Sequence, residues 1–244
     1  MPERKPDAVP EAAAAAGADS GVVTLDGPAG VGKTTLAKMT AQALGLAYLD
    51  TGAMFRATAL RLGEGAWDLP GEELAARLVP LTFRLSGAGA DSVLWCGDAP
   101  VGPEVRTEAV GMWAARLAGR PEVRDFQKAA QRAIGASLAL VVEGRDMGTV
   151  VFPRARRKFF LDAAPRVRAE RRATQLAEMG APADLDAIEQ AIRERDALDR
   201  NRPIATLIPA QDALVIDTSG LTLHQVFAAI MAGLSSGDQA LTVR

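Results

Sequence analysis

One segment of the sequence combines the residue types that hold a phosphate group. Residues 27–34 read GPAGVGKT and fit the pattern G-x-x-x-x-G-K-[ST]. Glycines lack a Cβ, so the backbone can wrap an anion closely and point successive N–H groups at its oxygens. Lys33 would then reach the β- and γ-phosphates of a nucleotide, and the Thr34 hydroxyl suits Mg²⁺. The segment predicts a nucleotide-binding loop with these binding residues: Gly27, Pro28, Ala29, Gly30, Val31, Gly32, Lys33, Thr34 and Thr35.

Arginines elsewhere in the chain predict a second anion site. Arg56 follows the turn DTGAM, Arg145 follows the apolar run LALVVE, and the segment ERDALDRNR carries three more arginines. A nucleotide kinase needs such cations to hold an anionic acceptor in line, whereas a switch or motor positions a water. The surplus of arginines therefore favours a kinase.

Short apolar runs that alternate with helical patterns predict an α/β fold in which these residues are positioned. Five runs have the composition of buried parallel strands: VVTLD (22–26), LAYLD (46–50), LALVVE (138–143), KFFLDA (158–163) and DALVID (212–217). The expected core is a P-loop domain with about five parallel strands. Open sheets of this kind bind ligands beyond the carboxyl ends of their strands, where Arg145 and Arg56 are expected.

The rest of the chain predicts an insertion and a helical cover. LTFRL and SVLWC look like two strands joined by a hairpin at SGAGAD, and two helical stretches are expected near 104–118 and 121–136. An Arg-rich helical pair, broken by GAPAD, lies between the last two core strands. The expected organisation is an extension at 1–20, a core at 21–66 and 103–235 with a lid near 165–182, an insertion at 67–102, and a tail at 236–244.

Composition limits the possible partners and locations. Of 244 residues, 48% are hydrophobic and 24% charged, the balance of a globular protein, and the net charge of −2 gives no general attraction to nucleic acid or membrane. Cys96 is the only cysteine, and no run of about 20 apolar residues could span a bilayer. We therefore expect a cytoplasmic protein that binds neither nucleic acid nor membrane.

Beyond the phosphate loop, the chain resembles the bacterial-type cytidylate kinases of the nucleoside monophosphate kinase superfamily from about Val22 to Leu234. The motifs that carry the resemblance are DGPAGVGKTT (26–35), LDTGAMFR (49–56), VRT (105–107), EGRDMGTVVFP (143–153), FLDA (160–163) and RDALDRNR (195–202). The resemblance implies transfer of the γ-phosphoryl of ATP to CMP or dCMP with Mg²⁺, a monomeric state, and a nucleotide-monophosphate-binding role for the insertion.

The resemblance also implies residue roles. Arg56 and Arg145 would grip the acceptor phosphate, Arg124 and Asp146 would face the cytosine, and Arg195 with Asp199 would address the sugar. Arg202 would lie between base and phosphate. Thr51 and Gly144, which belong to the matched motifs, would also contact the acceptor. The expected catalytic residues are Lys33, Arg145 and a lid arginine, with Arg168, Arg171 and Arg172 as candidates and Arg171 selected. Thr34 is the expected metal ligand, and Glu143 and Asp146 could help hold Mg²⁺ through water.

A carboxylate at position 146 favours cytosine over uracil, because it can accept a hydrogen bond from the exocyclic amine where uracil presents an oxygen. Two positions depart from the family pattern: Ala115 stands where a serine near the base is frequent, and Phe55 where tyrosine is common. Loss of the serine removes one hydrogen bond to the base, which either weakens discrimination or is replaced by a water. The relative preference for CMP, dCMP and UMP therefore stays open.

Two other classes of protein remain as alternatives. A kinase for another small acceptor, such as shikimate, would keep the phosphate loop but would not need the insertion or ERDALDRNR. A GTP-binding switch would need the guanine-reading element [NT]-K-x-D, which the sequence lacks. His224 lies away from every motif and is assigned no role, and Trp95 and Cys96 are expected to pack within the insertion.

Overall fold

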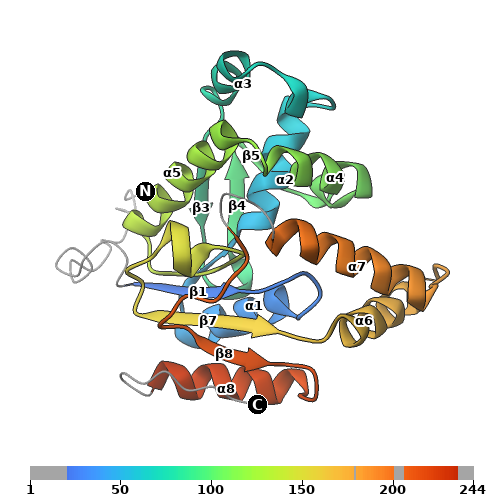
Figure 1. Ribbon diagram of the computed structural model, residues 1–244. Coiled ribbons are helices and arrows are strands. Elements are labelled where there is room, and N and C mark those ends of the chain that lie inside the picture. The colour runs from blue at the N-terminus through green and yellow to red at the C-terminus, as the bar shows by residue number, and fades with distance from the viewer. Residues whose placement is uncertain (1–20, 179, 201–205, 236–244) are drawn as a thin grey trace, which may run out of the picture.

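The computed structural model describes residues 21–178, 180–200 and 206–235. The predicted extension at 1–20, the predicted tail at 236–244 and Arg202 lie outside these residues. The centre of the molecule is an all-parallel sheet with the strand order β2-β6-β1-β7-β8 (Figure 1). Its strands are β1 (Val22–Asp26), β2 (Ala47–Asp50), β6 (Leu140–Gly144), β7 (Arg157–Asp162) and β8 (Leu214–Asp217). The α/β fold and the five predicted core strands are therefore confirmed.

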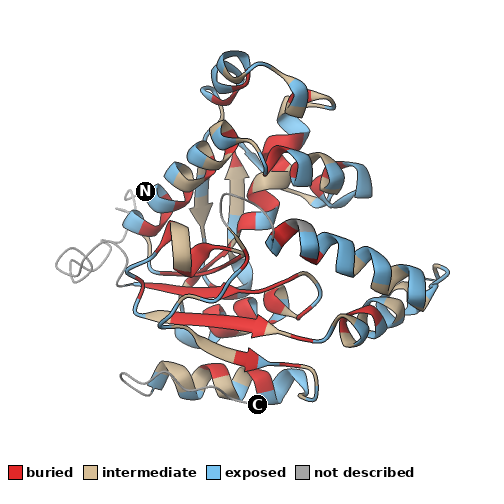
Figure 2. Cartoon of the chain, viewed as in Figure 1, coloured by how far each residue is buried: buried red, intermediate tan, exposed pale blue. Residues whose placement is uncertain are grey.

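The middle strands are buried on both faces, which explains their continuous apolar sequences. Every residue of β1 and β6 is buried, and the two strands pair in register from Val22 with Leu140 to Asp26 with Gly144 (Figure 2). Parallel strands covered by helices on both sides have this pattern instead of an apolar–polar alternation. The register brings the ends of β1 and β6 to the same level, where the functional motifs begin.

Helices on each face of the sheet complete two apolar cores. Leu36 of α1 (Lys33–Leu44) and Val226 of α8 (Leu223–Ser235) belong to the core on one face. Met54 of α2 (Thr51–Leu62) and Ile134 of α5 (Pro121–Ser137) belong to the core on the other. The helices thus hold the strand ends in a fixed relation to one another.

A second, antiparallel sheet lies beside α2 and α5. It contains β3 (Phe83–Ser86), β4 (Val93–Cys96) and β5 (Ala99–Pro100), and α3 (Gly71–Leu78) precedes it (Figure 1). The expected hairpin is present, with Phe83 opposite Cys96 and Ser86 opposite Val93. The strand β5 was not expected, because two residues are too few to show a periodic pattern.

Two segments differ in detail from the sequence-based expectation. The stretch near 104–118 is not one helix: a 3₁₀ turn at Pro103–Arg106 precedes α4 (Glu108–Leu117), and the Thr107 side chain caps α4 by accepting from the Val110 N–H at 3.3 Å. The segment Met147–Val151 forms a short π-helical turn that no periodicity indicated. Both are single turns, for which hydrophobic spacing carries little information.

The Arg-rich segment forms two packed helices, α6 (Pro165–Glu178) and α7 (Leu185–Arg200). Figure 1 shows this pair projecting from the carboxyl end of β7. Among the described helices, none has the length and apolar character needed to cross a bilayer.

Candidate active site

The phosphate loop, α2 and Arg145 begin where three neighbouring strands end. The loop follows β1, α2 starts directly after β2 at Thr51, and Arg145 follows β6. Since the three strands are adjacent and parallel, their carboxyl ends lie at one edge of the sheet. The topology therefore brings together motifs that lie far apart in the chain, such as the loop beginning at Gly27 and Arg145.

The phosphate loop depends on the close approach of β1 to β7. Gly27 has φ of 148°, and a Cβ placed on it would lie 2.1 Å from the carbonyl oxygen of Leu161. Gly32, in the left-handed conformation, starts α1, so that the free N–H groups of the first helical turn face the loop. The Lys33 ammonium folds back and donates to the Pro28 carbonyl oxygen at 2.6 Å. Backbone shape and charge are those of an anion site.

Burial weakens the hold of Lys33 on its proton. The pKa of Lys33 is lowered to about 7, chiefly by desolvation and next by the positive charge of Arg145, while Glu143 and Asp26 act in the opposite direction. A phosphate group in the loop would add the negative charge that favours the ammonium form. The electrostatics of the loop are therefore adapted to an anionic ligand.

Oxygen atoms near the loop fit a magnesium ion. The Thr34 hydroxyl lies close to Tyr48 and Glu143, and the Tyr48 hydroxyl donates to Glu143 Oε1 at 2.5 Å. Burial and the charge of Asp50 raise the pKa of Glu143. Within the described ranges no three His, Cys, Asp or Glu side chains form a metal cluster. One hydroxyl and one carboxylate suit Mg²⁺, which usually binds few protein groups and completes its shell with phosphates and waters.

Two charged pairs lie directly after β6. Asp146 Oδ2 accepts from Arg124 Nη2 of α5 at 2.7 Å, and the two side chains are only 6% and 12% exposed. Arg145 Nε donates to Asp199 Oδ2 of α7 at 3.1 Å. Four residues predicted to bind the acceptor are thus brought together from β6, α5 and α7.

The start of α2 holds two more predicted site residues. The Thr51 hydroxyl donates to the Glu143 carbonyl oxygen at 2.7 Å, which joins α2 to the end of β6. Arg56 Nη1 donates to the Val105 and Thr107 carbonyl oxygens at 3.2 and 3.3 Å. Desolvation, which is the largest effect, lowers the pKa of Arg56. The Arg56 guanidinium therefore links α2 to the turn before α4.

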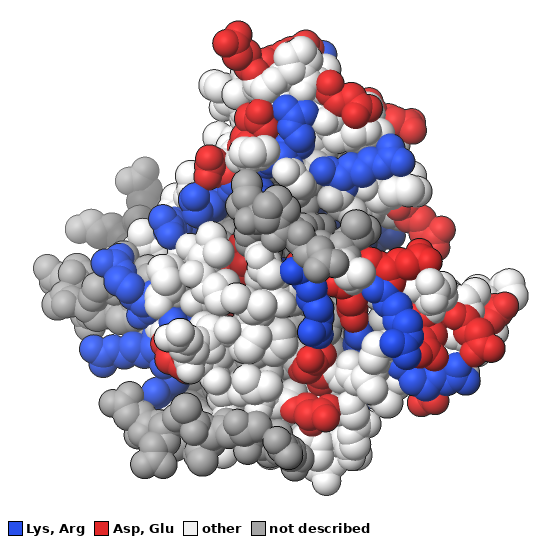
Figure 3. Space-filling view, viewed as in Figure 1, with Lys and Arg blue, Asp and Glu red and all other residues white. Residues whose placement is uncertain are grey.

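The lid arginines occupy three different environments. Arg168 is 1% exposed, pairs with Asp196 of α7 and donates from Nη1 to the Ala29 carbonyl oxygen of the phosphate loop at 3.1 Å. Arg171 donates to the Thr218 hydroxyl and carbonyl oxygens at 3.0 and 2.6 Å, after β8. Arg172 is exposed. In the space-filling view, basic and acidic side chains are interleaved over this helical pair (Figure 3).

The other predicted residues are less closely associated with the centre of the site. Arg195 is exposed on α7, although its charge acts on Lys33, and Gly144 is the buried last residue of β6. Arg202 falls in a part of the chain that the structure does not describe. Ala115 is exposed on α4.

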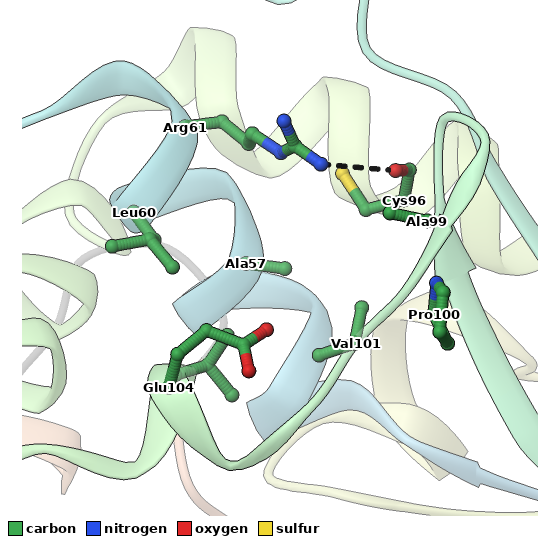
Figure 4. Close-up of a pocket in the computed structure, with 9 residues that line it drawn as sticks. Ala57, Leu60, Arg61, Cys96, Ala99, Pro100, Val101 and Glu104 are labelled. Carbon is green, nitrogen blue, oxygen red and sulfur yellow. Dashed lines mark hydrogen bonds between the residues drawn. The ribbon is translucent and has the colours of Figure 1, made fainter.

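Two hollows adjoin α2. The smaller one, of about 40 Å³, is lined by Phe55, Arg124 and Asp146, among others, and coincides with the predicted base site. The larger one, of about 310 Å³, lies between Ala57, Leu60 and Arg61 of α2 and the segment around Cys96 and Val101 (Figure 4). Arg61 Nη2 donates there to the Cys96 carbonyl oxygen at 3.4 Å, and no predicted site residue lines this cavity.

Sequence reasoning overlooked two buried polar residues at the site, Asp26 and Tyr48. Asp26 ends β1 and accepts from the backbone N–H groups of Met147 and Gly148, and Tyr48 holds Glu143. Asp26 opens the motif DGPAGVGKTT, which was a usable signal, but both residues lie inside runs that read as ordinary strands.

The comparisons with known proteins agree with this geometry. The family model described as cytidylate kinase matches residues 23–236. A cytidylate kinase of Nitratidesulfovibrio vulgaris strain Hildenborough is 57% identical over 217 residues, covering 89% of this chain and 94% of that protein. Those of Maridesulfovibrio salexigens (54% over 206 residues; 84% and 92% covered) and Pectobacterium carotovorum (44% over 216 residues; 86% and 94% covered) are also similar.

Among solved structures, a candidate kinase of Chloroflexus aurantiacus matches with a TM-score of 0.38 at 16% identity, over 90% of this chain and 98% of that chain. The match is too distant to support an argument. The family model and the relatives suffice: the chain belongs to the cytidylate kinase family, the nucleoside monophosphate kinases that phosphorylate CMP and dCMP with ATP.

Proposed function

We propose that the residues at the carboxyl ends of β1, β2 and β6 carry out this reaction in the present chain, transferring the γ-phosphoryl of ATP directly to CMP or dCMP. The observation that carries the proposal is the buried Asp146–Arg124 pair beside Arg145, one strand away from the phosphate loop. In this proposal, Asp146 and Arg124 read the base, Arg145 binds the acceptor phosphate, and the neighbouring loop binds the donor phosphates.

Catalysis in this proposal rests on position and charge. The acceptor phosphate oxygen is already anionic, so no strong base has to remove a proton before attack. The loop and Lys33 hold the donor phosphates, while Arg145 and Arg56 hold the acceptor phosphate in line with them. The cationic side chains then stabilise the negative charge on the transferred group. When bound, Mg²⁺ would neutralise phosphate charge, with the Thr34 hydroxyl and Glu143 as its protein partners.

Substrate binding would exchange hydrogen bonds that the arginines and lysine make within the protein. Lys33 donates to Pro28, Arg145 to Asp199, and Arg56 to two backbone carbonyls. Each donor is therefore partnered before a phosphate arrives, which limits the cost of holding buried cations together. Arg171 would have to leave Thr218 to act as the catalytic lid arginine, and Arg195 and Arg202 would contribute to sugar and phosphate binding.

The base is selected, in this proposal, by hydrogen-bond matching. Asp146 accepts from the exocyclic amine of cytosine, and Arg124 donates to the ring acceptors. Uracil would place its O4 against the Asp146 carboxylate. Both groups are hydrogen-bond acceptors, so no hydrogen bond would form between them in the buried site. The insertion at 67–102 would close over the nucleotide monophosphate and the helical pair over ATP, excluding water. We further propose that the protein acts as a monomer in the cytoplasm.

The test compares acceptors and position 146 together. ADP formation from ATP and Mg²⁺ is measured with CMP, dCMP, UMP, AMP, dTMP, shikimate or no acceptor. For the native chain, CMP and dCMP should lead. In Asp146→Ala the preference for CMP over UMP should fall by at least about tenfold, since a site that hydrogen-bonds its substrate discriminates strongly. Asp146→Asn should be more active with UMP than the native chain, because the side-chain amide can donate a hydrogen bond to the uracil oxygen.

Asp186→Ala serves as the control, because the Asp186 carboxylate is 89% exposed near the start of α7 and its partner Arg166 is 47% exposed. It should keep the native order of acceptors. Equal ADP formation with every acceptor or with none would refute the proposal, and a non-nucleotide acceptor in first place would favour the alternative small-molecule kinase.

A further inference from the structure

Asp26 is a buried carboxylate with no part in the roles assigned so far. It is the last residue of β1, directly before the phosphate loop, and is 5% exposed. Its Oδ1 accepts from the Met147 N–H at 2.9 Å and its Oδ2 from the Gly148 N–H at 2.7 Å. Each carboxylate oxygen thus holds one amide of the turn that follows Asp146.

The sheet itself does not require this carboxylate. β1 and β6 already pair from Val22 to Asp26, so the strands are aligned by their own backbone hydrogen bonds. Burying an acid costs free energy. Desolvation accordingly raises the pKa of Asp26 to about 6, and the charge of Asp146 raises it too. Burial of Asp26 is unfavourable and strand pairing does not need its carboxylate. We therefore look for its role in positioning the groups that it contacts.

The turn held by Asp26 carries the acceptor residues. Arg145 and Asp146 immediately precede Met147, and the π-helical turn Met147–Val151 starts at the first clamped amide. Directly before the turn, the Arg145 and Asp146 side chains make the contacts already described with Asp199 and Arg124. A shift of the Met147 amide would therefore move the side chains that face the acceptor.

Gly148 permits the close contact. A Cβ placed on it would lie 3.1 Å from Thr24 Oγ1, 3.2 Å from Lys158 Cδ and 3.4 Å from Asp26 Oδ2. A side chain at this position would crowd Thr24, Lys158 and Asp26, so that these groups or the turn would have to shift. We call the Asp26 carboxylate and the two backbone amides that it accepts from the Asp26 clamp (Asp26, Met147 and Gly148).

We infer that Asp26 is a positioning residue of the transfer reaction, which fixes Arg145 and Asp146 at a set distance from the phosphate loop through the Asp26 clamp. The inference rests on the acceptor roles proposed above for Arg145 and Asp146. Because Asp26 is covalently joined to Gly27, the same residue begins the donor loop and anchors the acceptor turn.

Asp26→Asn tests the clamp with nearly the same shape. The side-chain amide oxygen of the introduced asparagine can still accept a hydrogen bond from one of the two backbone N–H groups. Its NH₂ group is a donor and cannot accept from the other. We expect CMP affinity, measured by isothermal titration calorimetry without ATP, to fall about tenfold, since a hydrogen bond to a charged group is lost. The ratio of CMP to UMP affinity should narrow, while the KM for ATP stays within about twofold of the native value. A merely structural role would weaken both substrates together.

Gly148→Ala approaches the same contact from the turn and should reproduce the loss of CMP affinity with an unchanged Asp26. Asp186→Asn, the same substitution at a carboxylate that is 89% exposed and whose partner Arg166 is 47% exposed, should bind CMP like the native protein. Native CMP affinity in both clamp variants, or equal losses for ATP and CMP, would overturn the inference alone. Failure of the native protein to bind CMP would overturn the proposed function and the inference together.

Discussion

Burial changes the acid–base behaviour of individual residues in the site. Lys33 and Asp26, one a base and the other an acid, have pKa values moved toward neutrality, to about 7 and about 6. In both, desolvation of the charged form is the largest cause. In the proposed function, bound phosphates would favour the charged form of Lys33, whereas the Asp26 carboxylate is held by the amides of Met147 and Gly148.

The pKa of Asp26 predicts a pH dependence of stability. Its folded-state pKa of about 6 lies above the ordinary value of 3.8, so the folded protein binds the proton more tightly than the unfolded chain. The free energy of unfolding should consequently fall as pH rises from about 4 to about 6, and the Asp26 contribution should stay constant above that range. A shift of about two pKa units corresponds to about 3 kcal/mol.

Urea unfolding at intervals from pH 4 to 7 measures this effect as the difference between the native chain and Asp26→Asn. The native protein should lose stability relative to the variant across the window, because the amide does not titrate. Parallel curves would show that Asp26 has an ordinary pKa. The Asp186→Asn control, at a carboxylate that is 89% exposed, should follow the native curve.

At the scale of elements, one buried ion pair connects three parts of the chain. Arg168 of α6 pairs with Asp196 of α7 and also donates to the Ala163 and Ala29 carbonyl oxygens. Three residues further along α7, Asp199 accepts from Arg145. Two carboxylates on one face of α7 therefore bind two arginines: Asp196 binds Arg168, and Asp199 binds Arg145.

Removal of Asp196 should therefore loosen α6 and the loop together. Asp196→Ala leaves the Arg168 guanidinium buried without its counter-charge, and we expect a loss of about 3 kcal/mol in the free energy of unfolding. Hydrogen exchange should accelerate first in α6. Urea unfolding and exchange measured by mass spectrometry provide the two readouts.

Glu189→Ala is the matched control on the same helix. Glu189 accepts from Arg166 and Arg193, whose side chains are 47% and 57% exposed. Ion pairs that reach solvent contribute little, so this variant should unfold close to the native protein. An equal decrease in the free energy of unfolding in both variants would show that the Arg168–Asp196 pair stabilises the protein no more than an exposed ion pair does.

At the scale of the whole molecule, the site lies between three bodies of structure. The parallel sheet supplies the phosphate loop and Arg145, the region of the antiparallel sheet borders α2, and the helical pair α6–α7 borders the loop. With a net charge of −2, the molecule has no overall field that would attract nucleotides, so the proposed sites depend on local arginines and on Lys33.

Ligands that bind this arrangement should stabilise the entire molecule. CMP together with a non-hydrolysable ATP analogue, each at about a hundred times its Kd, should add about 2.7 kcal/mol per independent site to the free energy of unfolding. A thermal scan with each ligand alone and with both measures the increments. A joint shift larger than the sum would indicate that the two sites close together, whereas no shift with CMP would contradict the acceptor site.

The α/β class, the five core strands and the phosphate loop could all be predicted, because each depends on local information. Continuous apolar runs such as VVTLD identify buried parallel strands, and a strand followed by GPAGVGKT specifies a loop whose shape follows from its glycines. The resemblance likewise pointed to Arg124 and Asp146, which the structure brings within 2.7 Å of each other. Their catalytic and binding roles remain predictions.

The partners of the charged residues were decided only by the tertiary structure. Neither periodicity nor spacing could show that Asp26 meets the amides of Met147 and Gly148, or that Arg168 lies buried against Asp196 instead of facing solvent like Arg172. These contacts join residues separated by 28 to more than 120 positions, and they depend on strand order, register and helix docking. Hydrophobic patterning is encoded residue by residue along the chain, whereas the pairing of buried charges is settled only when distant strand ends meet at one edge of the sheet.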